Sequence, residues 1–201
     1  MSGFPGSPRL NKGGLVSLTN AIVFQYNPEQ LTRTITPNTF TGGGGQNEPL
    51  RFKGPPSESI SLEVQISAAD QLERARSPAT TMGIYPMLSA LELLVYPLAA
   101  RMAANQALAL LGVIEVVPPE APLTLFVWGP RRVLPVRITQ MSITEESFDP
   151  ALNPIQAKVG LTLQVLTYQD LGLLHAGGAM FMGHHLLKEV MAGINLGANH
   201  D

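Results

Sequence analysis

Two segments in which apolar and polar residues alternate strictly constrain the fold of this chain more than any other feature. The first covers residues 58–67 and the second covers residues 155–168. Successive side chains of a β-strand point to opposite faces, so each segment predicts a strand with one buried face and one wetted face. The polar side chains Lys158, Thr162 and Gln164 are expected on the wetted face. The predicted inward side chains are Ile60, Leu62, Val64, Ile66, Val159, Leu161, Leu163 and Val165.

Further strand signals lie on both sides of these segments. The pattern predicts strands at about residues 18–26 and 31–37, and a strand pair at 123–127 and 133–147. In the last of these the apolar residues predicted to point inward fall on even-numbered positions up to Ile138 and on odd-numbered positions from Met141. Such a shift by one residue is how a β-bulge looks in a sequence. A bulge bends its strand, as the wall of a barrel requires. We therefore expect a mainly β fold of the α+β type.

Three segments predict helices. Residues 83–97 carry an apolar stripe at helical spacing, with Pro86 acceptable in a first turn and Pro97 ending or kinking the helix. Residues 99–111 are rich in strong helix formers and are followed by a glycine. Residues 175–193 have the pattern of an amphipathic helix. The stripe of the first helix consists of Ile84, Met87, Leu88, Leu91, Leu94 and Val95.

These segments divide the chain into three parts. Residues 1–17 predict a flexible N-terminal arm, residues 18–170 a β-barrel domain, and residues 171–201 a helical C-terminal extension. Within the domain, residues 41–49 contain four consecutive glycines and predict a loop tip, and residues 67–81 predict a second loop. The extension has no second core, so its apolar side chains are candidates for docking to a partner. They are Met180, Phe181, Leu186, Leu187 and Met191.

Composition limits the classes of function. Hydrophobic residues make up 45% of the chain and charged residues 14%, which suits a subunit with permanent interfaces or a compact monomer with a large core. The net charge of −2 and the lack of a long basic run argue against a nucleic-acid partner, and Arg131 and Arg132 beside Trp128 are interpreted as solvated arginines of a hairpin tip. The stretch 171–187 lacks charge but contains several histidines and glycines, so no membrane span is expected. A soluble protein made in the cytoplasm is the resulting expectation.

The candidate catalytic features are weak, and we expect neither an enzyme nor a bound metal or cofactor. His184 and His185 are adjacent, so their side chains diverge on a helix and cannot chelate one ion together. Glu145 and Glu146 would lie on opposite faces of a strand, which disfavours an acid–base pair. The four glycines lack a following Lys-Ser/Thr, so their loop does not match a phosphate-binding P-loop. The absence of cysteine excludes disulfides and thiolate sites.

Three motifs follow one another along the chain. An opening strand ends in Phe-Gln-Tyr-Asn-Pro-Glu, a central helix has a Tyr-Pro pair at each end, and a closing strand reads Val-x-Leu-x-Leu-x-Val. This order resembles the tube-protein domain of contractile injection systems, the phage-tail-like machines with an inner tube, a sheath and a baseplate. The resemblance covers residues 19–168. The residues that carry it are Phe24, Tyr26, Asn27, Pro28, Glu29, Tyr85, Pro86, Leu88, Leu91, Glu92, Tyr96, Pro97, Leu161, Leu163 and Val165.

The resemblance implies a phage tail-tube-like β-barrel or closed sandwich of about six to eight strands, flanked by one helix. It also implies a homo-oligomer, a six-membered ring whose subunits share an inner barrel, with Lys158, Thr162 and Gln164 as candidates to line its lumen. The implied partners are the spike or hub protein, the inner-tube protein and other baseplate proteins, with the sheath as a further candidate. Such particles assemble in the bacterial cytoplasm and remain inside the cell or are released.

Within this family, the glycine loop, the segment 99–111 and the tail favour a baseplate inner-tube initiator, an adaptor ring that joins the spike hub to the inner tube. The alternatives are the main inner-tube subunit and a terminal tube cap. From another class, a small-ligand-binding β-barrel or an enzyme remains open. Some relatives in this position carry a C-terminal LysM module, but the tail after Tyr168 lacks its motif, so anchoring through LysM is not expected.

Overall fold

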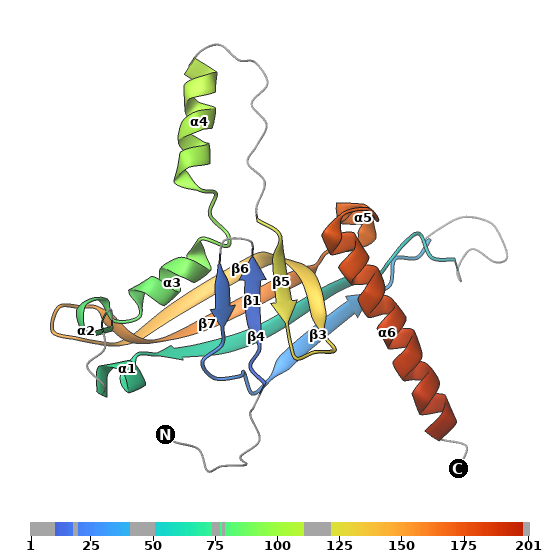
Figure 1. The fold of residues 1–201 in the computed structure, drawn as a ribbon, viewed down its shortest axis with the longest axis horizontal. Helices are drawn as coiled ribbons and strands as arrows, with labels where there is room; N and C mark the ends of the chain where they lie inside the picture. The colour runs from blue at the N-terminus through green and yellow to red at the C-terminus, as the bar shows by residue number, and fades with distance from the viewer. Residues whose placement is uncertain are drawn as a thin grey trace.

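The computed structural model describes residues 11–17, 20–40, 51–73, 77, 79–110 and 122–198, and its centre is one antiparallel sheet of seven strands (Figure 1). The order across the sheet is β2-β1-β5-β6-β7-β4-β3. The chain is therefore mainly β with added helices, as the alternating segments predicted. The strands are β1 (Gly14–Ser17), β2 (Ala21–Val23), β3 (Leu31–Thr36), β4 (Ser57–Ser67), β5 (Thr124–Val127), β6 (Val133–Phe148) and β7 (Pro154–Val165). The helices are α1 (Ala69–Glu73), α2 (Ala79–Met82), α3 (Tyr85–Glu92), α4 (Ala99–Leu110), α5 (Tyr168–Leu171) and α6 (Ala176–Ala198).

The sheet is not closed, so the described part of the chain does not form the closed barrel or sandwich that the sequence predicted. Strands β2 and β3 are its two edges and do not pair with each other. The reason lies in residues 24–30, which link them. After Val23 the chain leaves the sheet, Phe24 enters the core, and the side-chain oxygen of Gln25 accepts a hydrogen bond from the Ser67 N–H at 3.0 Å. The link therefore lies against the end of β4 and cannot extend β2 toward β3.

The same link shows that the sheet is strongly curled. A flat sheet of seven strands is about 29 Å wide, which is as far as eight fully extended residue steps reach, about 28 Å. The link is not fully extended, because it places Phe24 in the core and folds Gln25 onto β4. Ile22 of the edge strand β2 accordingly lines one small pocket with Val64 of β4 and Leu161 of β7, so the β2 edge approaches the far part of the sheet and the apolar side chains lie inside the curl.

The core is made by the inward faces that the alternation predicted. Leu161 of β7 lies opposite Leu62 of β4, and Val159 lies opposite Val64. These side chains are at most 5% exposed. Complete burial of one such side chain stabilises the fold by about 1.5–3 kcal/mol. All eight predicted inward residues of β4 and β7 are buried, so this prediction is confirmed.

The predicted β-bulge is also confirmed. The register between β6 and β7 shifts between Ile138 and Gln140, which leaves Thr139 as the extra residue. The Thr139 hydroxyl donates a hydrogen bond to the carbonyl oxygen of Thr162 at 3.1 Å. Because of the bulge, Met141 lies opposite Leu161 and keeps its side chain against the core.

Several predicted boundaries were wrong. The arm predicted over residues 1–17 ends earlier, because Gly14–Ser17 forms β1 and Leu15 is fully buried. The segment 67–81 is not a plain loop but contains the short helices α1 and α2. The glycine-rich stretch 41–49 and residues 1–10 lie outside the described residues.

Two helices, rather than the one predicted, pack against the sheet. Leu88 and Leu91 of α3 are buried against its apolar face. Helix α6 packs against β6 and α5, with Phe181 in contact with the core and with the ring of Tyr168. Helix α4 instead projects away from the sheet (Figure 1), and its described side chains are exposed or half-buried.

One glycine determines how α6 meets the sheet. Gly178 is buried in the first turn of α6, and a Cβ on this residue would collide with the carbonyl oxygen of Gly172. Any larger residue would push the start of α6 away from α5. The close approach lets Phe181, one turn later, reach the core.

The register of β7 makes a sharp prediction for two adjacent residues. Leu161 is 2% exposed and Thr162 is half-exposed on the opposite face. Leu161→Asp should abolish cooperative unfolding, because an unpaired buried charge costs several kcal/mol, a large part of the stability of a domain. Thr162→Asp should change the free energy of unfolding by less than about 1 kcal/mol. Thermal unfolding followed by circular dichroism tests both variants, and the opposite order would disprove this register.

Candidate functional site

An open groove of about 900 Å³ lies over the outer, polar face of the sheet. Its floor consists of β4, β6 and β7, and one wall is the link between β2 and β3. The groove brings together two sets of residues that the sequence predicted separately. The first set is Tyr26, Asn27, Pro28 and Glu29 of the link, and the second is Lys158 and Thr162 of the wetted face.

The Tyr-Asn-Pro-Glu motif owes its position to local hydrogen bonds. The Asn27 side chain accepts a hydrogen bond from the Gly13 N–H and donates one to the Asn11 carbonyl oxygen, both at 2.9 Å. Pro28 follows directly and fixes its own backbone angle φ. These contacts hold the motif beside the segment that leads into β1, and they leave Tyr26 half exposed at the groove.

Apolar side chains on the outer face of β3, β4, β7 and β6 are confined to the two ends of β6 and the start of β7, where Val133, Pro135, Phe148 and Pro154 share its parity. Between them, the outward residues of the four strands are polar or glycine. The strand registers place Thr32, Ser61, Thr162 and Gln140 in one row across the sheet. The polar middle of this face consists of Thr32, Thr34, Thr36, Ser57, Ser59, Ser61, Glu63, Gln65, Arg137, Gln140, Ser142, Thr144, Glu146, Gln156, Lys158, Gly160, Thr162 and Gln164. It is a wetted surface of mostly uncharged hydroxyl and amide groups.

The one cation among the described residues that line the groove is paired. Lys158 donates a hydrogen bond to the Glu146 carboxylate at 2.8 Å, and this contact raises the pKa of Lys158. The charge of Glu63 on the neighbouring strand acts in the same direction. Glu145 lies on the opposite face from Glu146, as predicted, so the two carboxylates do not face each other across one site.

The other predicted motif residues lie away from the groove. Gln164 shares the outer face but binds the Ser57 hydroxyl at 3.1 Å, while Leu163 and Val165 are in the core. The motif residues of the central helix belong to the opposite, apolar side of the sheet. There Leu88 and Leu91 are buried, Pro86 lies in the first turn of α3, and Tyr85, Glu92 and Tyr96 are exposed, with Pro97 half-buried after the helix.

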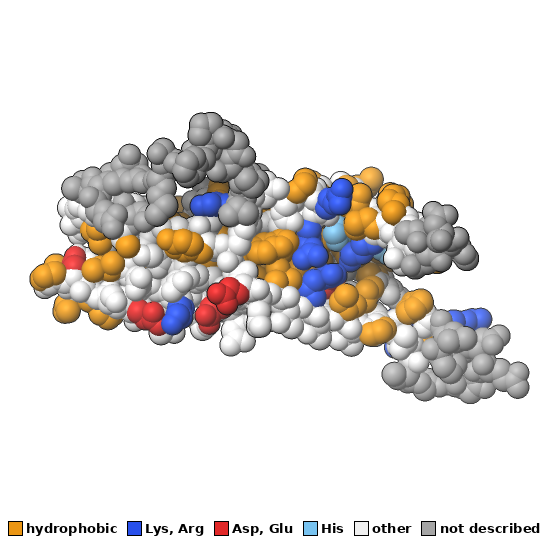
Figure 2. Space-filling model, turned by 90° about the horizontal axis from the view of Figure 1, so that it is seen from below, with side chains coloured by type: hydrophobic (Ala, Val, Ile, Leu, Met, Phe, Trp, Pro, Cys, Tyr) orange, Lys and Arg blue, Asp and Glu red, His pale blue; other side chains and the backbone are white. Residues whose placement is uncertain are grey.

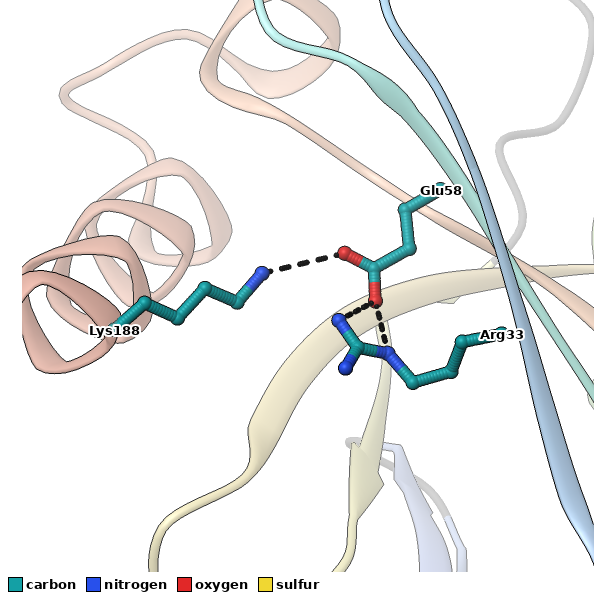
Figure 3. Close-up of polar contacts among 3 residues, drawn as sticks. All are labelled: Arg33, Glu58 and Lys188. Carbon is teal, nitrogen blue, oxygen red and sulfur yellow. Dashed lines mark hydrogen bonds and ion pairs between the residues drawn. The ribbon is translucent and has the colours of Figure 1, made fainter. Parts of the chain in front are cut away.

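Sequence reasoning missed a buried carboxylate at the other end of β4. Glu58 is 4% exposed and lies on the inward face. Its Oε1 accepts a hydrogen bond from Nε of Arg33 at 2.7 Å and forms an ion pair with Nη2 at 2.6 Å (Figure 3). Its Oε2 lies 3.3 Å from the Nζ of Lys188 on α6. The sequence did contain a signal for this buried position. Glu58 lies two residues before Ile60 and four before Leu62, so in an alternating strand it shares their inward face. An inward carboxylate requires a cationic partner.

Arg132 and His184 complete a group that we call the cationic cluster, namely Arg33, Arg132, His184 and Lys188 around Glu58. Burial lowers the pKa of Arg132, and the charge of Arg33 lowers it further, while Glu58 opposes the change. Both arginines interpreted as solvated residues of a hairpin tip lie in the β5–β6 turn, but only Arg131 is exposed, whereas Arg132 is half-buried. Figure 2 shows one part of the surface where several Lys and Arg side chains gather around a His side chain.

Comparison with known proteins adds no identification, since no protein-family model matches the chain and no curated protein is significantly similar to it. Among the described residues, no three His, Asp or Glu side chains lie together as metal ligands. No helix in the described ranges is both long and apolar enough to cross a membrane.

The environment of His184 predicts a pH dependence of stability. Burial, followed by the charge of Lys188, lowers the pKa of His184 below its ordinary value of 6.5. Arg132 and Arg33 act in the same direction, and Glu58 opposes them. The unfolded chain therefore binds a proton at a higher pH than the folded chain, and stability falls as the pH drops below about 6.5.

The variant His184→Gln lacks this contribution, so its urea midpoint should fall less than that of the wild type between about pH 7.5 and pH 5.5. His185→Gln is the matched control, because His185 is exposed on the same helix beside Glu189. It should retain most of the pH dependence. Identical pH profiles for the wild type and His184→Gln would contradict the prediction.

Proposed function

We propose that this chain is a structural subunit of a contractile injection system, and that it forms the baseplate inner-tube initiator ring between the spike hub and the inner tube. The polar outer face of β3, β4, β7 and β6 carries the proposal. A conduit for cargo needs a wetted wall that does not adhere to what passes. A face of Ser, Thr and Gln side chains, with Lys158 paired to Glu146, meets that need.

The two open edges of the sheet support ring formation. Strands β2 and β3 each leave one row of backbone N–H and C=O groups without a strand partner among the described residues. Pairing of one subunit's edge with the next satisfies these groups and continues the sheet around a ring. Repetition of one head-to-tail contact produces a closed ring when the rotation closes.

Exposed apolar side chains support contacts with other proteins of a baseplate. Many of them lie in two places, and an assembled subunit would bury such surfaces in permanent interfaces. The first is the region of α3 and α4, with Tyr85, Leu93, Tyr96, Leu98, Met102 and Leu110. The second is the C-terminal half of α6, with Val190, Met191, Ile194 and Leu196.

The docking surface predicted in the tail divides into two parts. Phe181 packs against the core and Leu187 is half-buried, so these two belong partly to the subunit itself. Met180, Leu186 and Met191 are exposed and remain candidates for docking. The projecting α4 and the end of α6 are additions to the sheet, and they favour an adaptor ring over the main inner-tube subunit or a terminal cap.

A second candidate function, from a different class, is binding of a small polar ligand. The groove beside Tyr26, with its hydroxyl and amide lining, is the observation that favours it. In that case the purified chain would be a monomer that carries a ligand, and its edges would stay unpaired.

Electron microscopy and light scattering of the purified chain test the proposed function. Rings with about six times the monomer mass are expected, by the resemblance to tube proteins. In intact particles assembled in the bacterial cytoplasm, the copy number should equal one ring, whereas a main tube subunit would be present in many rings. A strictly monomeric chain at high concentration that is also missing from particles would exclude the proposal.

The role of the tail can be tested without disturbing the core. Deletion from Gly172 onward would remove Phe181 and the Lys188 contact to Glu58, so that truncation is expected to destabilise the domain. Deletion of residues 190–201 removes only the part of α6 beyond these contacts. We expect this shorter variant to fold with a similar melting temperature and to fail in particle assembly.

The double substitution Val190→Gln with Ile194→Gln should reproduce the assembly defect, because both side chains are exposed and apolar. Ala192→Gln, which adds an amide at an exposed position between them, is the matched control and should assemble normally. Normal particle yield from the truncated chain would rule out a docking role for this half of α6.

A further inference from the structure

The cationic cluster contains more positive charge than its carboxylate can neutralise. Arg33, Arg132 and Lys188 are three permanent cations that come from β3, the β5–β6 turn and α6. In the described part of the chain, Glu58 is the one carboxylate that acts on the pKa of Arg132 or of His184. Two positive charges in the described cluster therefore lack a counter-charge.

No side chain among the described residues pairs with the guanidinium of Arg132. Both oxygens of Glu58 are already occupied, one by Arg33 and the other by Lys188. Within the described ranges Arg132 forms no ion pair. Its backbone is held in the turn, because its carbonyl oxygen accepts a hydrogen bond from the Trp128 N–H at 2.8 Å. Half-burial removes part of the water that would otherwise solvate this charge.

We propose that the cationic cluster is a binding site for an oxyanion, either a phosphate or a carboxylate. A planar guanidinium binds two oxygens of such a group side by side, and an ammonium adds a charge-assisted hydrogen bond. Arg132 supplies the free guanidinium, and Lys188 has donors beyond the one directed at Glu58. The charges of both residues act on His184. An anion at this point supplies the counter-charge that Glu58 alone cannot.

The bound oxyanion would also fasten α6 to the sheet. Lys188 and His184 belong to α6, whereas Arg132 precedes β6 and Arg33 lies on the edge strand β3. A ligand that contacts both groups connects the helix to the sheet in addition to the Glu58–Lys188 contact. This proposal concerns the chain alone and does not depend on the proposed function.

Thermal unfolding in the presence of inorganic phosphate tests the site. At about 10 mM, phosphate should raise the melting temperature of the wild type by about 4 °C or more relative to chloride at equal ionic strength. The variant Arg132→Gln should unfold near the wild-type temperature in chloride and lose the increase in phosphate. Arg131→Gln is the matched control, since Arg131 is the exposed neighbour outside the cluster, and it should keep the increase.

Calorimetric titration of phosphate into the wild-type chain keeps the proposal testable if Arg132→Gln does not fold. Saturable binding is expected in the wild type, and weaker binding in Arg132→Lys, which keeps the charge but loses the planar fork. A parallel titration with acetate shows whether the site prefers a carboxylate or a phosphate. Preference for acetate indicates the carboxylate of a protein side chain, and preference for phosphate indicates a phosphate group. The proposal fails if neither anion binds saturably, or if Arg132→Gln responds as the wild type does.

Discussion

One-sided burial of the long strands β4, β6 and β7 is the constraint on which the rest of the structure depends. Their inward side chains form the core, so their outward side chains must form a surface, and the strict alternation leaves no freedom to exchange the two. The bulge at Thr139 preserves this arrangement along the longest strand, because it returns Met141 to the core side. Both the core and the polar face thus follow from one periodicity.

The Tyr-Asn-Pro-Glu motif acquires a structural meaning from the link between the two edges of the sheet. Phe24 anchors the link in the core, Gln25 binds the end of β4, and Asn27 binds the segment before β1. These contacts explain why the motif stands beside the groove and why the sheet stays open. An open, curled sheet has two edges available to neighbouring copies, and this property connects the fold to the proposed ring.

Helix α6 joins the sheet through an apolar and an ionic contact. Phe181 reaches the core because Gly178 permits a close approach, and Lys188 shares the buried carboxylate of Glu58 with Arg33. Breaking a buried ion pair by removing one partner is more costly than losing a surface pair, so Glu58 makes the position of α6 specific. From residue 189 to residue 196 the side chains of the helix are exposed, and there its apolar residues are available to other proteins.

Sequence alone determined the local features of this protein, namely the long strands, the face on which each residue lies, the bulge, and the helices near residues 85–92, 99–110 and 176–198. These depend on periods of two or 3.6 residues, which a sequence displays directly. Only the tertiary structure decided that Leu15 belongs to the core, that the sheet stays open, and that Arg33 and Lys188, 25 and 130 residues away, meet Glu58. The sequence marked Glu58 as an inward carboxylate but could not name its partners, because distant segments meet only through the packing of the whole chain.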